Sequence, residues 1–291
     1  MFNARSCLGL KSLIRRSYSS NTLRKKFYKS VSVINGETGV KPSSSSASSS
    51  AEFEICLDDR KLKTPNGSIL RIPNRTLAHA IATEWSAQSG HIDPTQMHLT
   101  GLAFTSIDNP LRRTKSDLIE KIVHYVDTDT VLYPEPGLEK LYHQQLQEWG
   151  GAVRKLNSLF GTDLQLTDNL DGPPVSVHSL AAFSSYLDAF NFWALNGYLF
   201  TVEALRSFVL SCLLIEHRLF AKEAVRLASL EQDYQTGIWG HIEWAHEVEF
   251  QGTLSRAAAG ALFTRLCSST EWSSSSVSRR RADSAAAATT S

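Results

Sequence analysis

The hydrophobic periodicity changes once along this chain of 291 residues, and the change restricts the folds open to it. Between Phe27 and Pro73, short β-branched stretches such as "FYKSVSVI" and "EFEICLDD" are separated by turn residues such as "PNG", a pattern typical of antiparallel strands. From Asn74 onward, apolar residues recur at helical spacing instead. The sequence therefore predicts an α+β protein with a small N-terminal antiparallel β domain, residues 27–73, followed by a larger all-helical bundle domain, residues 74–267.

The first predicted helix begins at Asn74, a residue type that caps helices well, and carries Leu77, Ile81 and Trp85 on one face. An aromatic side chain at such a position is usually part of the core, so Trp85 is predicted to anchor the junction between the β domain and the helices. Two further helical stretches follow, "LRRTKSDLIEKIVHYV" and "GLEKLYHQQLQEWGGAVRKLNSLF". After the break at "DGPPVS", four more helices are expected at residues 178–192, 193–219, 221–236 and 239–267.

The N-terminal segment has the composition of a mitochondrial transit peptide. It is rich in Arg and Ser, and its first acidic residue is Glu37. We predict a transit peptide over residues 1–26, with cleavage after Tyr18 in "RRSYSS". That cleavage removes four of the 30 Lys and Arg residues and none of the 29 Asp and Glu residues, which leaves a net charge of −3. A mildly acidic mature protein argues against nucleic-acid binding, because phosphates favour a basic surface.

Two segments lack the apolar residues needed to pack. The Ser-rich stretch at residues 36–51 is predicted to be a disordered insert within the β domain, and residues 268–291 are predicted to be a disordered tail. The most apolar segment, "YLFTVEALRSFVLSCLLI", contains Glu203 and Arg206, so it is predicted to be part of the core and not a membrane insertion.

The stretch "WGHIEWAHEVEF", residues 239–250, holds the densest group of chemically active side chains. Glu243 and His246 form an ExxH, a spacing that di-iron bundles use to direct two ligands inward, but no second ExxH is present to complete such a site. The two histidines of the stretch are five residues apart and point about 140° from each other on a helix. A metal-dependent enzyme is therefore kept only as the alternative hypothesis.

Other catalytic signals in the sequence are weak. Asp127 and Asp129 in "VDTDTVLY" match the DxD that can hold a divalent ion, but short carboxylates at a helix end more often accept hydrogen bonds from backbone amides. There is no Gly-rich phosphate loop and no GxSxG motif. We therefore predict no catalytic residue, no metal and no cofactor.

Five blocks of sequence occur in an order that resembles one known family. "LDDRKLKTP", "ATEW", "MHLTGLAFTSIDNP", "DTDTVLY" and "WGHIEWAHE" together resemble the mitochondrial ATP synthase catalytic-sector assembly factor 2 family, the chaperones of the α subunit. The resemblance runs from about Phe27 to Leu266, outside the Ser-rich insert. It implies a monomeric, non-enzymatic protein of the mitochondrial matrix that binds unassembled α subunit and prevents its aggregation until β subunits replace it.

The resemblance also implies a functional acidic residue in the last block, for which Glu243 is the candidate and Glu247 the second choice. Independently, two glutamates at i and i+4 repel each other on a helix, and a cationic partner surface would relieve that repulsion. An ordinary solvent-exposed helix face remains the simpler alternative. Trp239 and Trp244 are predicted to contribute to partner binding beside the two glutamates, although Trp244 could equally lie in the core.

Overall fold

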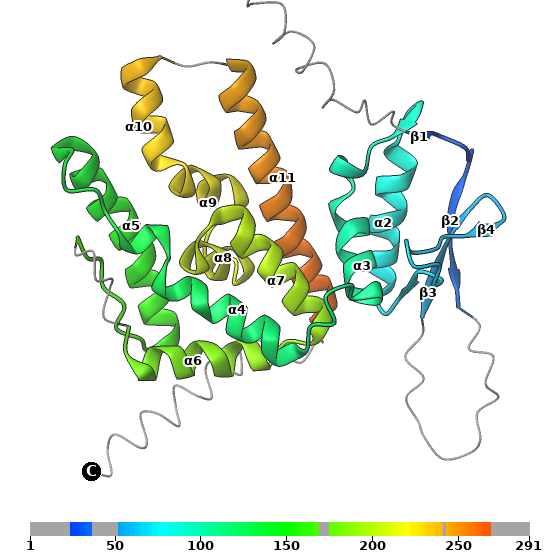
Figure 1. The fold of residues 1–291 in the computed structure, drawn as a ribbon, viewed down its shortest axis with the longest axis horizontal. Coiled ribbons are helices and arrows are strands. Elements are labelled where there is room, and N and C mark those ends of the chain that lie inside the picture. Colours follow the sequence, from blue (N-terminus) through cyan, green and yellow to red (C-terminus); the bar gives the residue numbers. More distant parts are fainter. Residues whose placement is uncertain (1–23, 37–51, 169–174, 241–242, 269–291) are drawn as a thin grey trace, which may run out of the picture.

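The protein consists of two small antiparallel sheets at one end and a bundle of helices at the other, as the α+β prediction requires (Figure 1). The computed structural model describes residues 24–36, 52–168, 175–240 and 243–268, and within these ranges the side chains of Glu243 and Trp244 are not described. The predicted disordered insert and tail lie almost wholly outside the described residues, as does most of the predicted transit peptide. Within the described part, no helix has the length and apolarity that a membrane span requires.

The larger sheet contains the strands that the sequence pattern predicted. Strands β2 (Val31–Asn35), β3 (Phe53–Leu57) and β4 (Arg60–Lys61) lie side by side, and β5 (Arg71–Ile72) also pairs with β3. All pairings are antiparallel, with Val31 opposite Leu57 and Asn35 opposite Phe53. The central strand β3 is almost entirely buried, because α2 covers it and strands flank it.

A second, two-stranded sheet was not predicted. It pairs β1 (Arg24–Lys25) with β6 (His91–Ile92), which follows α2 (Arg75–Ala87) in the chain. A strand of two residues is too short to produce a detectable alternation of apolar and polar residues. The pairing brings the start of the described chain back beside the end of α2.

Two carboxylates connect the sequence blocks at this end of the molecule. Glu84 accepts hydrogen bonds from the backbone N–H groups of Leu99 and Thr100, both at 2.8 Å, at the start of α3 (His98–Asp108). At the end of α3, Asp108 accepts a hydrogen bond from the Thr64 hydroxyl at 2.6 Å. Burial raises the pKa of Glu84 although these hydrogen bonds act in the opposite direction. The polar residues of "ATEW", "SIDNP" and "LKTP" therefore fix the position of α3.

The remaining helices form the bundle, and their bounds are α4 (Lys115–Asp127), α5 (Glu139–Phe160), α6 (Val177–Asp188), α7 (Phe192–Leu205), α8 (Phe208–Ile215), α9 (Ala221–Ala228), α10 (Leu230–Trp239) and α11 (Glu243–Cys267). Short 3₁₀ turns, η2 (Pro94–Gln96) and η3 (Thr130–Leu132), precede α3 and α5. Helix α11 lies between the bundle and α2 and α3, and so connects the two ends of the molecule (Figure 1).

Two long helices predicted from the sequence are each broken in the structure. The predicted helix 193–219 is wrong because Arg206 adopts φ 54° and the Ser207 hydroxyl accepts a hydrogen bond from the Leu210 N–H, which starts α8 as a new helix. The predicted helix 221–236 is wrong because α9 ends at Ala228 and α10 begins at Leu230. In both cases the apolar spacing continues across the break, so periodicity alone did not reveal it.

Helices α7 and α11 approach each other closely at two glycines. A Cβ atom at Gly260 would lie 2.9 Å from the Gly197 carbonyl oxygen, and one at Gly197 would lie 2.9 Å from the Thr264 backbone nitrogen. The Thr201 hydroxyl donates to the Gly197 carbonyl of its own helix at 2.9 Å. The Thr264 hydroxyl lies 2.9 Å from the Gly260 carbonyl of its own helix and 3.2 Å from the Ala194 carbonyl of α7. The absence of side chains at these two positions is what allows the backbones to touch.

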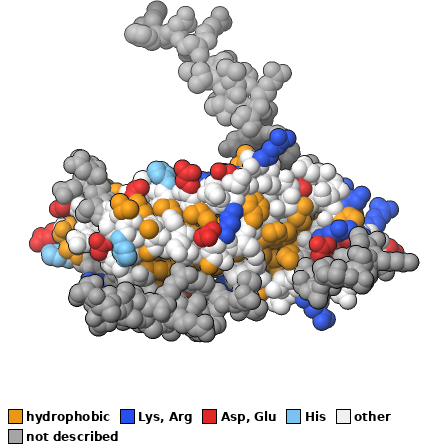
Figure 2. Space-filling view, turned by 90° about the horizontal axis from the view of Figure 1, so that it is seen from below, with side chains coloured by type: hydrophobic (Ala, Val, Ile, Leu, Met, Phe, Trp, Pro, Cys, Tyr) orange, Lys and Arg blue, Asp and Glu red, His pale blue; other side chains and the backbone are white. Residues whose placement is uncertain are grey.

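Charge is unevenly distributed over the surface. On the face shown in Figure 2, hydrophobic side chains form a broken band along the molecule, and Lys and Arg side chains gather mainly toward the end that carries the strands. Acidic side chains are frequent at the opposite, helical end. On this face, the cationic side chains are therefore concentrated near the strands.

Candidate partner-binding surface

Helices α10 and the first half of α11 project together from the bundle (Figure 1). The sequence predicted one helix over residues 239–267, and this is wrong at its start. Trp239 is the last residue of α10, Gly240 follows with φ 100°, and α11 begins only at Glu243. Glycine adopts this conformation without the strain that a side chain would introduce. The stretch "WGHIEWAHEVEF" therefore contains the end of α10, Gly240 and the start of α11, and its His241 lies outside the described residues. Helix α10 and the first half of α11 are called the α10–α11 hairpin below.

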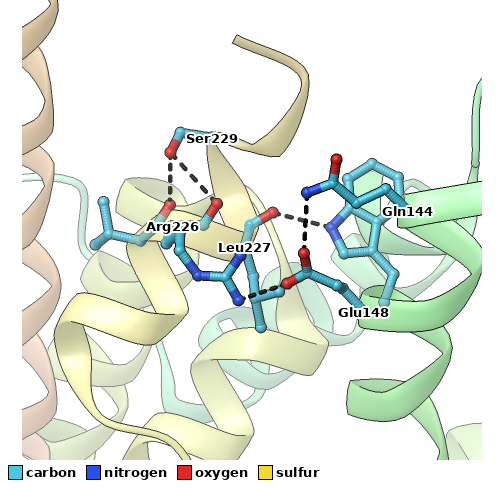
Figure 3. Close-up of polar contacts among 7 residues, drawn as sticks. Gln144, Glu148, Arg226, Leu227 and Ser229 are labelled. Atoms are coloured by element: carbon cyan, nitrogen blue, oxygen red, sulfur yellow. Dashed lines mark hydrogen bonds and ion pairs between the residues drawn. The ribbon is translucent and has the colours of Figure 1, made fainter. Parts of the chain in front are cut away.

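The base of this projection is held by polar contacts between α5 and α9 (Figure 3). The Arg226 guanidinium lies 2.5 Å from the Glu148 carboxylate, which also accepts a hydrogen bond from the Gln144 amide at 3.0 Å. The hydrogen bond from Arg226 lowers the pKa of Glu148. The buried indole of Trp149 donates to the Leu227 carbonyl at 2.9 Å. These contacts fix α9, and through it the start of α10, against α5.

A groove of about 340 Å³ lies between the two projecting helices, α9 and the end of α7. Five of its lining residues are acidic, namely Glu203, Glu231, Asp233, Glu247 and Glu249. Two are arginines, Arg206 and Arg256. The groove therefore carries an excess of negative charge, although the whole chain is nearly neutral.

Two of these carboxylates are held by neutral partners. The Gln251 amide donates to Glu247 at 2.7 Å, and the Gln232 amide donates to Glu249 at 3.0 Å across the hairpin. Within the described part of the chain, neither carboxylate lies within salt-bridge distance of a cation. A glutamine amide orients a carboxylate without cancelling its charge, so both charges remain available to a cationic partner.

Large apolar side chains are exposed on the same projection. Trp239 is 84% exposed, Val248 68% and Ile238 58%. A tryptophan this exposed contributes almost nothing to a core, whereas tryptophan is strongly enriched at the energetic centres of interfaces. The hairpin therefore combines apolar contact area with a negative groove.

The structure describes the side chains of only two of the four predicted partner-binding residues. Trp239 and Glu247 lie on the projecting hairpin, while Glu243 and Trp244 are located only as the first two residues of α11. The sequence reasoning did not identify Glu231, Glu249 or the exposed Val248 as neighbours. The acidic stretch "EQD" on the other side of Gly240 was the signal available, but it becomes informative only once the hairpin is known.

The residues considered for metal binding have structural roles or lie apart. Asp129 is completely buried and accepts hydrogen bonds from the backbone N–H groups of Val131 at 3.0 Å and Val209 at 2.8 Å, as the helix-end interpretation predicted. Burial raises the pKa of Asp129 to about 6, against the effect of these hydrogen bonds. No cluster of three or more His, Cys, Asp or Glu side chains suited to a metal exists within the described ranges. The metal-dependent enzyme thus gains no support from this part of the chain.

Trp85 lies where a structural anchor is expected. It is 8% exposed at the end of α2, its ring centroid is 5.7 Å from that of Tyr28, and the Tyr28 hydroxyl donates to its carbonyl at 2.7 Å. These contacts join the segment before β2 to α2. The assignment of Trp85 as an anchor and not a partner contact remains a proposal, which a substitution can test.

Comparisons with known proteins find similarity to a family of molecular chaperones. Residues 25–157 match the family described as "ATP12 chaperone protein". The chain is 29% identical to "Protein atp12, mitochondrial" of Schizosaccharomyces pombe, over 74% of this chain and 77% of the relative, and 27% identical to "Protein ATP12, mitochondrial" of Saccharomyces cerevisiae, over 68% and 74%. Its fold resembles the crystal structure of Atp12 from Paracoccus denitrificans, with a TM-score of 0.70 and 24% identity over 84% of this chain and 98% of that one.

By these matches, the chain is similar to the ATP12 chaperone family. The family match runs from Lys25 in β1 to Asn157 in α5, and so it ends before the projecting hairpin. The role of the hairpin therefore has to be argued from the surface itself.

Proposed function

We propose that this protein is a mitochondrial matrix chaperone for assembly of the ATP synthase catalytic sector, which binds unassembled α subunit and prevents its aggregation until β subunits replace it. The match of residues 25–157 to the ATP12 chaperone family and the similarity to relatives named as mitochondrial proteins support this proposal. The observation that carries it furthest is the projecting α10–α11 hairpin, which combines an exposed Trp239 with a groove in which Glu247 and Glu249 form no salt bridge with a described residue. No step of this proposal uses a cofactor or a catalytic residue.

The α subunit is proposed to bind at the hairpin through Glu243, Glu247, Trp239 and Trp244. Carboxylates at a rim steer and select a cationic partner surface, and a large exposed aromatic supplies apolar contact area. Binding of β subunits to the same α subunit would displace the chaperone by competition. The protein is proposed to act as a monomer.

The domain division is also part of the proposal. It comprises a transit peptide within residues 1–26 that is cleaved after Tyr18, a β domain at 27–73 with the insert at 36–51, a helical domain at 74–267 and a tail at 268–291. Strand β1 begins at Arg24, so a mature chain that starts at Ser19 keeps the β1–β6 sheet. The cationic, acid-free start of the sequence supports import into the matrix.

Reversing charge on the hairpin is expected to weaken capture of the α subunit more than neutralising it does. Glu243→Lys and Glu247→Lys place a cation against a cationic partner, and juxtaposed like charges at an interface cost several kcal/mol. We expect capture to fall by about tenfold or more for at least one Lys variant, and by only about threefold for the matching Gln variant. The measurement is pull-down of newly synthesised α subunit at two salt concentrations, because screening should reduce the difference between variants.

Glu120→Lys is the matched control, since Glu120 is an exposed residue of α4, a helix that contributes no lining residue to the groove. It makes the same change in net charge and should leave capture unchanged. Circular dichroism should show that all variants remain folded. Equal capture by wild type and every Glu243 and Glu247 variant would contradict a role of these two carboxylates in binding the α subunit.

A further inference from the structure

A second surface lies at the opposite end of the molecule, where the two sheets meet α2 and α3. A groove of about 900 Å³ opens there, and it is largely apolar. Its lining includes Leu57, Leu62 and Ile92, which are buried, and Phe27, which is 56% exposed. Helices α2 and α3 contribute Trp85 and Phe104. The volume exceeds that of any one side chain and lies within the range of sites that bind ligands.

All charged side chains that line this groove are basic. They are Arg24 from β1, Arg60 and Lys61 from β4, and Lys63 from the segment after β4. Lys61 is paired with Glu54 at 2.6 Å. The other three form no salt bridge with any described residue, and the Arg24 guanidinium lies 5.1 Å from the centre of the Phe27 ring. Three positive charges around an apolar surface are thus left without a counter-charge inside the described chain.

These features select one kind of occupant. An apolar side chain could fill the groove and remove its surface from water, while flanking carboxylates could pair with Arg24, Arg60 and Lys63. In the mature chain that starts at Ser19, residues 19–23 directly precede Arg24, but they contain no acidic residue that could pair with the basic groove. The lining comes from two separate sheets and two helices, which suits a polypeptide segment laid across the groove with both of its ends continuing outside.

We propose that this basic apolar groove binds a polypeptide segment of a partner in which a large apolar side chain is flanked by acidic residues. The site is distinct from the α10–α11 hairpin and has the opposite charge. It gives the protein two surfaces of complementary character, so one client could be held at a negative and a positive contact together. The proposal stands on the groove itself and does not require the client to be the α subunit.

Calorimetric titration of the mature protein with short synthetic peptides tests the proposal. A Glu-flanked Phe peptide is expected to bind saturably, with affinity that falls as salt is raised. A Lys-flanked Phe peptide and a Glu-flanked Ser peptide should each bind at least tenfold more weakly. Equal binding of all three peptides, or no binding of the first, would overturn the proposal.

Substitutions of the basic residues around the groove test whether the peptide binds there. Arg60→Glu combined with Lys63→Glu should reduce affinity for the Glu-flanked Phe peptide by about tenfold or more, because both residues are exposed and their charges become repulsive. Lys155→Glu combined with Lys222→Glu, on exposed positions of α5 and α9, makes the same net charge change and should alter affinity less than about twofold. Equal losses in both double variants would show that only overall charge matters and would contradict the site.

The same variants exclude other occupants. If the groove joined two copies of this chain, the wild type would dimerise in sedimentation experiments and the Arg60→Glu and Lys63→Glu variant would not, and that result would replace the peptide by a second copy. If vesicles of anionic phospholipid competed fully with the peptide, a lipid surface would be the occupant instead. A monomer whose peptide binding survives such vesicles supports the proposal.

Discussion

Trp85→Arg is expected to lower the free energy of unfolding by about 5 kcal/mol, which is enough to leave little folded protein in cells. The substitution removes a large buried side chain that packs against Tyr28. It also introduces a charge next to a groove whose charged lining residues are all cations, so no described carboxylate of that lining could pair with it. Thermal unfolding of the purified protein and its abundance in cells both measure the effect.

Trp85→Phe is the control that keeps most of the apolar side chain and introduces no charge. Phenylalanine keeps most of the apolar area, and it removes an indole N–H that is buried without an acceptor in the described part of the chain. We expect it to cost only about 1 to 2 kcal/mol. A Trp85→Arg protein with wild-type stability that had lost only its client would contradict the anchoring role and assign Trp85 to an interface.

Gly260→Ala is expected to destabilise the protein by about 2 to 3 kcal/mol, although alanine is the better helix former. The added methyl group would lie 2.9 Å from the Gly197 carbonyl oxygen and 3.1 Å from the Phe200 ring of α7, and still closer to the Thr201 hydroxyl. A backbone carbonyl cannot move aside without shifting its helix. Because α11 connects the bundle to α2 and α3, separation of α7 and α11 would loosen both ends of the molecule.

Gly252→Ala is the matched control on the same helix. A Cβ atom at Gly252 has no neighbouring atom within 4 Å, so only the helix preference applies there. We expect a gain of about 0.5 to 1 kcal/mol, opposite in sign to the change at Gly260. Chemical denaturation of the two variants measures both effects, and equal shifts in the same direction would refute the close contact.

The sequence predicted best those elements whose signals are local. Asn74 was expected to cap α2, and its side chain accepts hydrogen bonds from the N–H groups of Thr76 and Leu77. Leu77, Ile81 and Trp85 were expected on one face of that helix, and all three are buried. The helix breaks at Arg206 and Ser229 were missed because the apolar spacing continues through them. The β1–β6 pair was missed because strands of two residues are too short to show an alternation of apolar and polar residues.

The candidate surface was predictable only in part for a related reason. The acidic and aromatic content of "WGHIEWAHEVEF" is visible in the sequence, and it drew attention to Trp239 and Glu247, which lie on the projecting hairpin. Without the turn at Gly240, however, the opposing Gln232 and Glu231 of α10 could not be placed across from Glu249. The basic groove was not predictable at all, because its lining is drawn from strands and helices spread over residues 24–104.

Aggregation of freshly diluted, unfolded α subunit, followed by light scattering with and without the mature protein, tests the central claim most directly. The account predicts that about one equivalent of this chaperone suppresses the scattering, that a complex of the two proteins can be isolated, and that addition of β subunit releases the chaperone. An unrelated globular protein of similar charge provides the reference. Scattering that rises as fast with this protein as with the reference, and no isolable complex, would contradict the account.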